Sequence, residues 1–173
     1  MRWLQRHAWW GLLIITLTMI SFGVTDVLVG PAADRGIPLA LTGMTLEELE
    51  ADGSASYRLF DFFTRANGYS LLMIGMFGTA ILLFAFRRNL RWAWWTMWLL
   101  PAWAAGVAVF YLIAGVESDQ PPPPPMVSGP ILAVLAAAIL LVSAPRFFRV
   151  QGDCGASAAA VRERKSGPGG ARR

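Results

Sequence analysis

Four long stretches without a charged side chain constrain the fold of this protein more than any other feature of its sequence. They cover residues 8–25, 66–86, 92–116 and 120–145. An α-helix rises about 1.5 Å per residue, so about 20 residues cross the roughly 30 Å of hydrocarbon in a bilayer. A helix also satisfies its own backbone hydrogen bonds in lipid. The sequence therefore predicts an all-α integral membrane four-helix bundle, with spans at about residues 8–28, 66–86, 92–115 and 127–145.

Composition agrees with this class. Of the 173 residues, 55% are hydrophobic and only 15% are charged, whereas soluble domains carry about 25% charged residues. The first stretch follows Arg2 and Arg6 and precedes the small residues "GPAAD", which is the order of features in a secretory signal peptide. Its apolar part is longer than the roughly 7 to 15 residues of such peptides, so we interpret it as a retained span.

The basic residues predict the orientation. Twelve of the fifteen lie before the first span, between the second and third spans, or after the fourth, while the other connections carry nine of the eleven acids if Asp26 is counted with them. Basic residues near the ends of spans stay in the cytoplasm. We therefore expect both termini to be cytoplasmic, in a multi-pass protein of the plasma membrane and specifically of the bacterial inner membrane. Residues 1–150 form the membrane domain, and residues 151–173 are expected to be a disordered, basic cytoplasmic tail.

Tryptophans gather at the same predicted side of the membrane, next to these basic residues. Tryptophan is amphipathic and collects at the headgroup level, so we predict a set of interfacial anchors. The set comprises Trp9, Trp10, Trp92, Trp94, Trp95 and Trp98. Trp103 follows Trp92 by about eleven residues and lies roughly 17 Å deeper, where it either packs between helices or lines a ligand cavity.

The connection between the first two spans is predicted to hold a short extracytoplasmic helical segment. In "MTLEELEADG", Thr45 can cap the amide of Glu48 while the Glu48 carboxylate reaches back, and Gly53 can end the helix. The following "SASYRLFDFFTRANG" is amphipathic. It is expected either to lie in the outer interface or to extend the second span.

Four charged residues form the candidate polar pocket, at the outer mouth of the bundle. Arg58, Asp61 and Arg65 are spaced three and four residues apart, so they share one helical face. Asp26 is the unusual member, because it lies in an apolar run where a carboxylate is costly. Two interpretations stay open: Asp26 faces the bundle and pairs with Arg58 or Arg65, or it is solvated at a helix end.

Small residues predict which helix faces pack together, because they let helix backbones approach closely in lipid. In the second span they are Gly68, Gly75, Gly78 and Thr79, and in the first they are Thr18, Ser21 and Thr25 above Gly11. Pro101 removes a backbone donor and is expected to bend the third span.

From Gly11 to Ser143 the chain resembles the small four-span bacterial proteins called DoxX-like and neighbouring families of unknown function. The resemblance rests on a glycine-bearing first span, on "YRLFDFFTRANGYSLLMIGMFG" leading into the second, on a basic turn, and on a proline-bearing loop before the last span. It implies a four-span fold and no catalytic motif. Some DoxX-like proteins are subunits of quinone-linked oxidoreductases, but no residue here carries that role across.

No catalytic, cofactor-binding or metal-binding residue is predicted. The single cysteine, Cys154, rules out an internal disulfide, and the single histidine, His7, rules out a histidine-rich metal site. The basic residues are explained by topology, so no nucleic-acid partner is expected. The five prolines at 121–125 form either a stiff loop or a docking site for a partner.

Two functions follow from these observations. The first is a non-catalytic interaction or accessory subunit that contacts the bilayer and binds other membrane proteins or itself. The alternative is a binder or carrier of a small apolar or quinone-like ligand, with a pocket near the outer membrane face.

Overall fold

The computed structural model describes residues 2–115 and 123–148, and every regular element within them is helical. In chain order the elements are α1 (Arg2–Val29), η1 (Gly30–Ala33), α2 (Gly36–Thr42), α3 (Leu46–Asp52), α4 (Ser54–Ile81), η2 (Leu82–Phe86), α5 (Arg91–Met97), α6 (Leu99–Ala114) and α7 (Pro124–Phe148). The predicted tail at 151–173 lies outside the described residues, as do the first two of the five prolines.

Four helical stretches in the described chain are long and apolar enough to cross a membrane, as predicted. They are His7–Ala33, Ala55–Phe86, Arg91–Ala114 and Pro125–Phe148. The second is much longer than the predicted 66–86. The amphipathic stretch before residue 66 continues into the span as one helix, so of the two expected arrangements the structure adopts the extension.

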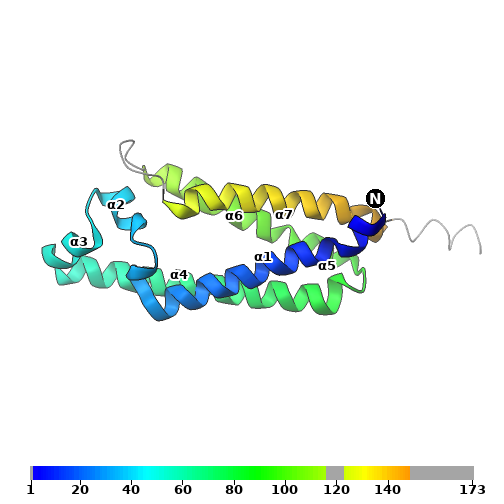
Figure 1. Cartoon of the computed structure of the whole chain (residues 1–173), viewed down its shortest axis with the longest axis horizontal. Coiled ribbons are helices and arrows are strands. Elements are labelled where there is room, and N and C mark those ends of the chain that lie inside the picture. The colour runs from blue at the N-terminus through cyan, green and yellow to red at the C-terminus, as the bar shows by residue number, and fades with distance from the viewer. Residues whose placement is uncertain (1, 116–122, 149–173) are drawn as a thin grey trace, which may run out of the picture.

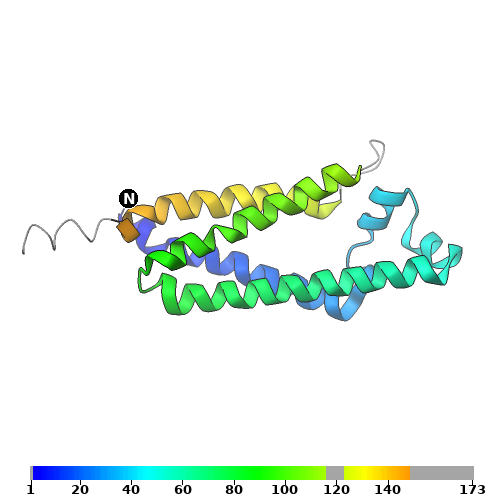
Figure 2. The ribbon, with the colours of Figure 1, turned by 180° about the vertical axis from the view of Figure 1, so that it is seen from behind.

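The spans form two antiparallel pairs (Figures 1 and 2). The helix α1 packs most extensively against α4, and α6 packs against α7, while contacts between α1 and α7 join the pairs. The start of α1, the turn from η2 to α5, and the end of α7 lie together at one end (Figure 1). We name it the basic end, because it carries Arg2, Arg6, Arg87, Arg88, Arg91 and Arg146. The opposite end holds α2 and α3, and we name it the acidic end.

The apolar core lies in the half of the bundle nearer the basic end. Leu12, Leu82, Phe86, Met97 and Leu140 are almost completely buried there, and they come from α1, η2, α5 and α7. The rings of Phe86 and Phe147 lie 4.7 Å apart, centroid to centroid. Lipid tails are as apolar as these side chains, so close van der Waals packing holds the helices together rather than removal from water.

Glycines let α1 and α4 approach each other at backbone distance. A Cβ added at Gly23 would lie 2.5 Å from the Leu72 nitrogen and 2.7 Å from the Gly68 oxygen. Gly75 lies in the same way against Thr16 and Ile20. The predicted packing face of α4 is therefore confirmed, and the Thr79 hydroxyl donates to the Thr16 hydroxyl at 3.0 Å beside it.

The predicted packing face of α1 is confirmed only at Gly11, where an added Cβ would lie 2.8 Å from the Ile139 Cδ1 of α7. Ser21 and Thr25 are exposed, and the Thr25 hydroxyl donates to the Ser21 carbonyl of its own helix. The residues that meet α4 are instead Thr16, Ile20 and Gly23. Hydroxyls that return to their own backbone need no partner helix, so the face they occupy can point to lipid.

The third span is interrupted at Trp98, between α5 and α6. Pro101 has no N–H to donate to the carbonyl four residues before it, and its ring crowds that turn. The Trp98 amide donates to the Trp95 carbonyl three residues back, which tightens the chain at this point. The sequence predicted a bend at Pro101, and the structure shows a break in the regular helix at Trp98, three residues before the proline.

Candidate functional site

The acidic end carries the predicted capped helix as α3. The Thr45 hydroxyl accepts from the Glu48 amide at 3.2 Å, and the Glu48 carboxylate accepts from the Thr45 amide at 2.7 Å. The hydrogen bond from the Thr45 amide is the main reason that the pKa of Glu48 is lowered. Leu46 and Leu49 are buried, which fixes this helix to the rest of the acidic end. The capping box predicted from the sequence is confirmed.

An ion pair on α4 closes the end of α1. The Arg65 Nε lies 2.9 Å from the Asp61 Oδ1, and the Arg65 Nη1 donates to the Val27 carbonyl. That carbonyl belongs to the last turn of α1, where four carbonyls lack a partner within the helix and the dipole favours a cation. Arg65 therefore serves as a cap supplied by a neighbouring helix.

Gly30 makes room for this ion pair. Its φ is +66°, in the left-handed region that favours glycine. A Cβ at this position would lie 2.6 Å from the Asp61 Oδ1 and 2.8 Å from the Arg65 Nη2. The backbone of the turn at Gly30 therefore packs directly against the Asp61–Arg65 ion pair of α4.

Two of the four predicted pocket residues form this contact. Asp61 and Arg65 form the ion pair, and Arg58 lies exposed nearer the start of α4. Asp26 is half-buried and faces α4, with its Cβ where a side chain at Gly68 would have to lie. This placement agrees with a carboxylate that faces the bundle. Arg65 pairs with Asp61, and the pairing of Asp26 with Arg58 or Arg65 stays a prediction.

Two further polar residues belong to this region and were missed by sequence reasoning. Asp34, which follows η1, and Tyr111, on α6, lie within electrostatic reach of Asp26 and of each other. Burial raises the pKa of the Asp34 carboxyl, although the hydrogen bond from the Gly36 amide acts in the opposite direction. The order Gly30–Pro31 after an apolar helix is a signal for a helix end, and it could have placed Asp34 at the mouth of the bundle.

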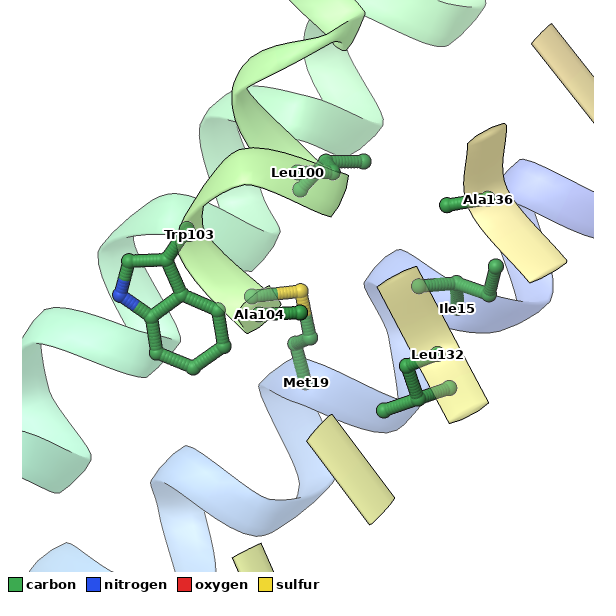
Figure 3. A pocket seen from close by; sticks show the side chains of 7 residues that line it. All are labelled: Ile15, Met19, Leu100, Trp103, Ala104, Leu132 and Ala136. Carbon is green, nitrogen blue, oxygen red and sulfur yellow. The ribbon is translucent and has the colours of Figure 1, made fainter. Parts of the chain in front are cut away.

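The cavity beside Trp103 is small and apolar. It lies between α1, α6 and α7 and is lined by Ile15, Met19, Leu100, Trp103, Ala104, Leu132 and Ala136, as Figure 3 shows. Its volume is about 20 Å³. That is room for about one water, whereas sites for small molecules are usually about 300 to 1,000 Å³. Trp103 contacts the core of the bundle and leaves no space here for a quinone-sized ligand.

An apolar patch lies on α4 beside its charged residues. It consists of Leu59, Phe62 and Phe63, whose exposed fractions are 58%, 64% and 60%. The two phenylalanine rings lie edge to face, with centroids 5.8 Å apart. The patch flanks Asp61 in the sequence, at the level where the ion pair contacts the end of α1. It therefore lies beside charged groups, within the longer second span that begins at Ala55.

The predicted tryptophan anchors divide into two groups. Trp10, Trp92 and Trp95 are exposed, as expected of side chains that meet lipid headgroups. Trp94 is only 6% exposed, and its indole N–H donates to the Leu140 carbonyl at 2.9 Å. An anchoring role does not fit Trp94, because helical periodicity turns it inward between Trp92 and Trp95. Trp9 and Trp98 are half-buried.

Within residues 2–115 and 123–148, no three His, Cys, Asp or Glu side chains come together in a way that could hold a metal ion. No family model, no curated protein and no solved structure matches this chain. The resemblance to DoxX-like proteins therefore stays a prediction from the sequence.

Proposed function

We propose that this chain is a non-catalytic accessory subunit of the plasma membrane, specifically of the bacterial inner membrane. Its basic end faces the cytoplasm, because basic residues flanking spans are retained there. Its acidic end, with α2 and α3, faces outward. The observation that carries the proposal is the patch Leu59, Phe62 and Phe63, which exposes two aromatic rings at the level of charged residues. Exposed aromatic clusters of this kind mark binding surfaces.

Charge favours another membrane protein over a second copy as the partner. From residue 26 to residue 65 the chain carries seven acids and three arginines, and α3 alone contributes four of the acids. Two copies in one membrane would share their orientation and bring these acids together, which disfavours association. A partner that presents apolar side chains beside basic residues fits this end.

The carrier function receives less support. A carrier needs a cavity of the size of its ligand, and the cavity beside Trp103 is about 20 Å³. The polar residues Asp26, Asp34 and Tyr111 lie at the acidic end, where a quinone-like molecule would enter. We retain this function only as the second candidate.

Comparative copurification tests the proposal. Tagged wild-type protein and the double variant Phe62→Ser/Phe63→Ser are purified from native membranes under identical conditions. Copurified proteins are then quantified by mass spectrometry. We expect the partner, an integral membrane protein, to be recovered with the wild type and to fall about tenfold or more with the variant, since aromatic anchors dominate interface energies.

The matched control is Phe110→Ser on α6. Phe110 is 73% exposed, but unlike the patch it has no charged residue near it in the sequence. It should leave the partner bound. Equal losses for the control and the double variant, or no loss for either, would contradict the proposed surface. Bound apolar small molecules in the wild-type sample would favour the carrier instead.

A further inference from the structure

A second cavity lies at the basic end, away from the patch and the ion pair. Its volume is about 300 Å³. It is lined by His7, Trp9 and Trp10 of α1, by Arg87 after η2, and by Arg146 of α7. Three segments that are distant in the sequence thus build one site, and two of them contribute a guanidinium.

The side chains of this site are held by contacts with each other. The Arg87 guanidinium lies over the Trp9 ring, 4.9 Å from its centroid, and the rings of Trp9 and Trp10 are stacked 4.3 Å apart. The Arg146 Nη2 donates to the Arg87 carbonyl at 3.4 Å. An arginine oriented by an aromatic ring keeps its planar fork of donors available for an anion.

The positive charge at this end favours the binding of an anion. Among the side chains that the structure describes, four arginines lie there, Arg87, Arg88, Arg91 and Arg146, and all seven acids lie between residues 26 and 61, towards the opposite end. The repulsion among these arginines is relieved by anions. A phosphate group suits this end, because the planar Arg87 guanidinium can form two parallel hydrogen bonds to its oxygens while the Arg146 guanidinium adds a second positive charge beside it.

The position of the cavity identifies the kind of anion. It opens where the apolar part of α1 begins, beside Trp10, which is 50% exposed. Tryptophan at the end of a span marks the headgroup level. Basic pockets between membrane helices at this level bind phosphate-bearing lipid headgroups. A cavity of about 300 Å³ takes a phosphoglycerol head while the acyl chains stay outside in the bilayer.

We propose that the cavity formed by His7, Trp9, Trp10, Arg87 and Arg146 binds the phosphate group of an anionic phospholipid. Arg87 and Arg146 hold the phosphate, and the stacked tryptophans cover one side of it. The site is independent of the partner surface on α4, since the two lie at opposite ends of the bundle.

Lipid titration of the purified full-length protein tests this site. Phosphatidylglycerol, phosphatidylcholine with the same acyl chains, and inorganic phosphate are each added to protein in a neutral detergent. Native mass spectrometry counts the bound lipid, and the melting temperature reports stabilisation. We expect phosphatidylglycerol to bind about tenfold more tightly than phosphatidylcholine, and inorganic phosphate at the same concentration to leave the melting temperature unchanged.

Three variants separate the site from general surface charge. Arg87→Gln and Arg146→Gln should each weaken phosphatidylglycerol binding about fivefold to tenfold, as each removes a charged donor. Arg88→Gln is the matched control, because Arg88 carries the same charge in the same turn but does not line the cavity. It should change binding by less than about twofold. Arg87→Lys, which keeps the charge and loses the planar fork, should fall between wild type and Arg87→Gln.

Each contrary outcome would overturn the proposal. Equal losses for Arg87→Gln and Arg88→Gln would show diffuse attraction to the basic end. Inorganic phosphate that stabilises as strongly as the lipid would show a site for free anions. If the arginine variants fail to fold, the lipid titration of the wild-type protein still tests the proposal. Equal affinity for phosphatidylglycerol and phosphatidylcholine would refute an anionic lipid site.

Discussion

The two halves of the bundle are held together by different kinds of contact. In the half nearer the basic end, large side chains such as Phe86, Met97 and Leu140 fill the space between helices. In the other half, α1 and α4 meet through Gly23 and Gly68, and one ion pair closes the end of α1. The stability of the first half depends on large side chains that fill the space between helices. The stability of the second half depends on glycines, which have no side chain and let the backbones approach, and on a few polar contacts.

Truncation in the packed half should have the largest effect. Phe86→Ala should lower the free energy of unfolding by about 3 kcal/mol or more, because it opens a cavity among close-packed side chains. Chemical unfolding in mixed micelles, followed by circular dichroism, measures the change. Phe84→Ala is the control, since Phe84 is 68% exposed, and it should change stability by less than about 0.5 kcal/mol. Similar losses for the two variants would contradict a core confined to the inward face.

Enlargement should be the damaging change in the other half. Gly23→Ala places a methyl group against backbone atoms of α4, which cannot move aside as a side chain can. We expect a loss of about 2 kcal/mol, within the range for overpacked sites. Gly106→Ala on α6 is the control, because a Cβ there meets nothing within 4 Å. That variant should be neutral or stabilising by up to about 1 kcal/mol, and a neutral Gly23→Ala would show that the helices are not in backbone contact.

In the second half, the sequence predicted the packing face of α4 but not that of α1. The packing glycines of α4 could be found because small residues in a membrane helix have few other uses. The inward positions of Trp94 and of Thr16 could not be found, since a helix in lipid is apolar on all sides and periodicity does not distinguish lipid from core. The spans themselves could be predicted because the thickness of the bilayer fixes their length.

The candidate site was only partly predictable for a related reason. Spacing along one helix was sufficient to predict that Asp61 and Arg65 would meet, since they lie one turn apart. The contact of Arg65 with the Val27 carbonyl and the approach of Tyr111 to Asp34 join segments far apart in the chain. Such contacts follow from the packing of the helices, which no local pattern specifies.

The polar contact between α4 and α1 should contribute less than either kind of packing. Arg65→Gln removes the ion pair with Asp61 and the charged cap on α1, and we expect a loss of about 1 kcal/mol because the pair is partly exposed. Arg35→Gln provides the comparison. Its ion pair with Glu47 is about two-thirds exposed on both sides, so the loss should stay below about 0.5 kcal/mol. A loss in stability for Arg35→Gln as large as that for Arg65→Gln would show that the cap on α1 adds no stability beyond that of an exposed ion pair.

The smallest effect should come from Asp34, and its sign depends on pH. Burial raises the pKa of this carboxyl above its ordinary value of 3.8, so the folded protein binds the proton more tightly than the unfolded chain does. The resulting stabilisation is fully present below about pH 3.8 and is lost as the pH rises through the folded pKa. At neutral pH the charged Asp34 is thus a cost to folding, and Asp34→Asn should remove it while its amide oxygen still accepts from Gly36. We expect a gain of no more than about 0.5 kcal/mol at pH 7, because solvent screens a partly exposed charge, and no gain near pH 3.8.

Glu48→Gln should behave in the opposite sense, since the pKa of Glu48 is lowered and its stabilisation is present at neutral pH and lost on acidification. Melting temperatures of the three proteins across this pH range measure both signs, and a gain for Asp34→Asn that does not vary with pH would mean that the buried charge is not its cause.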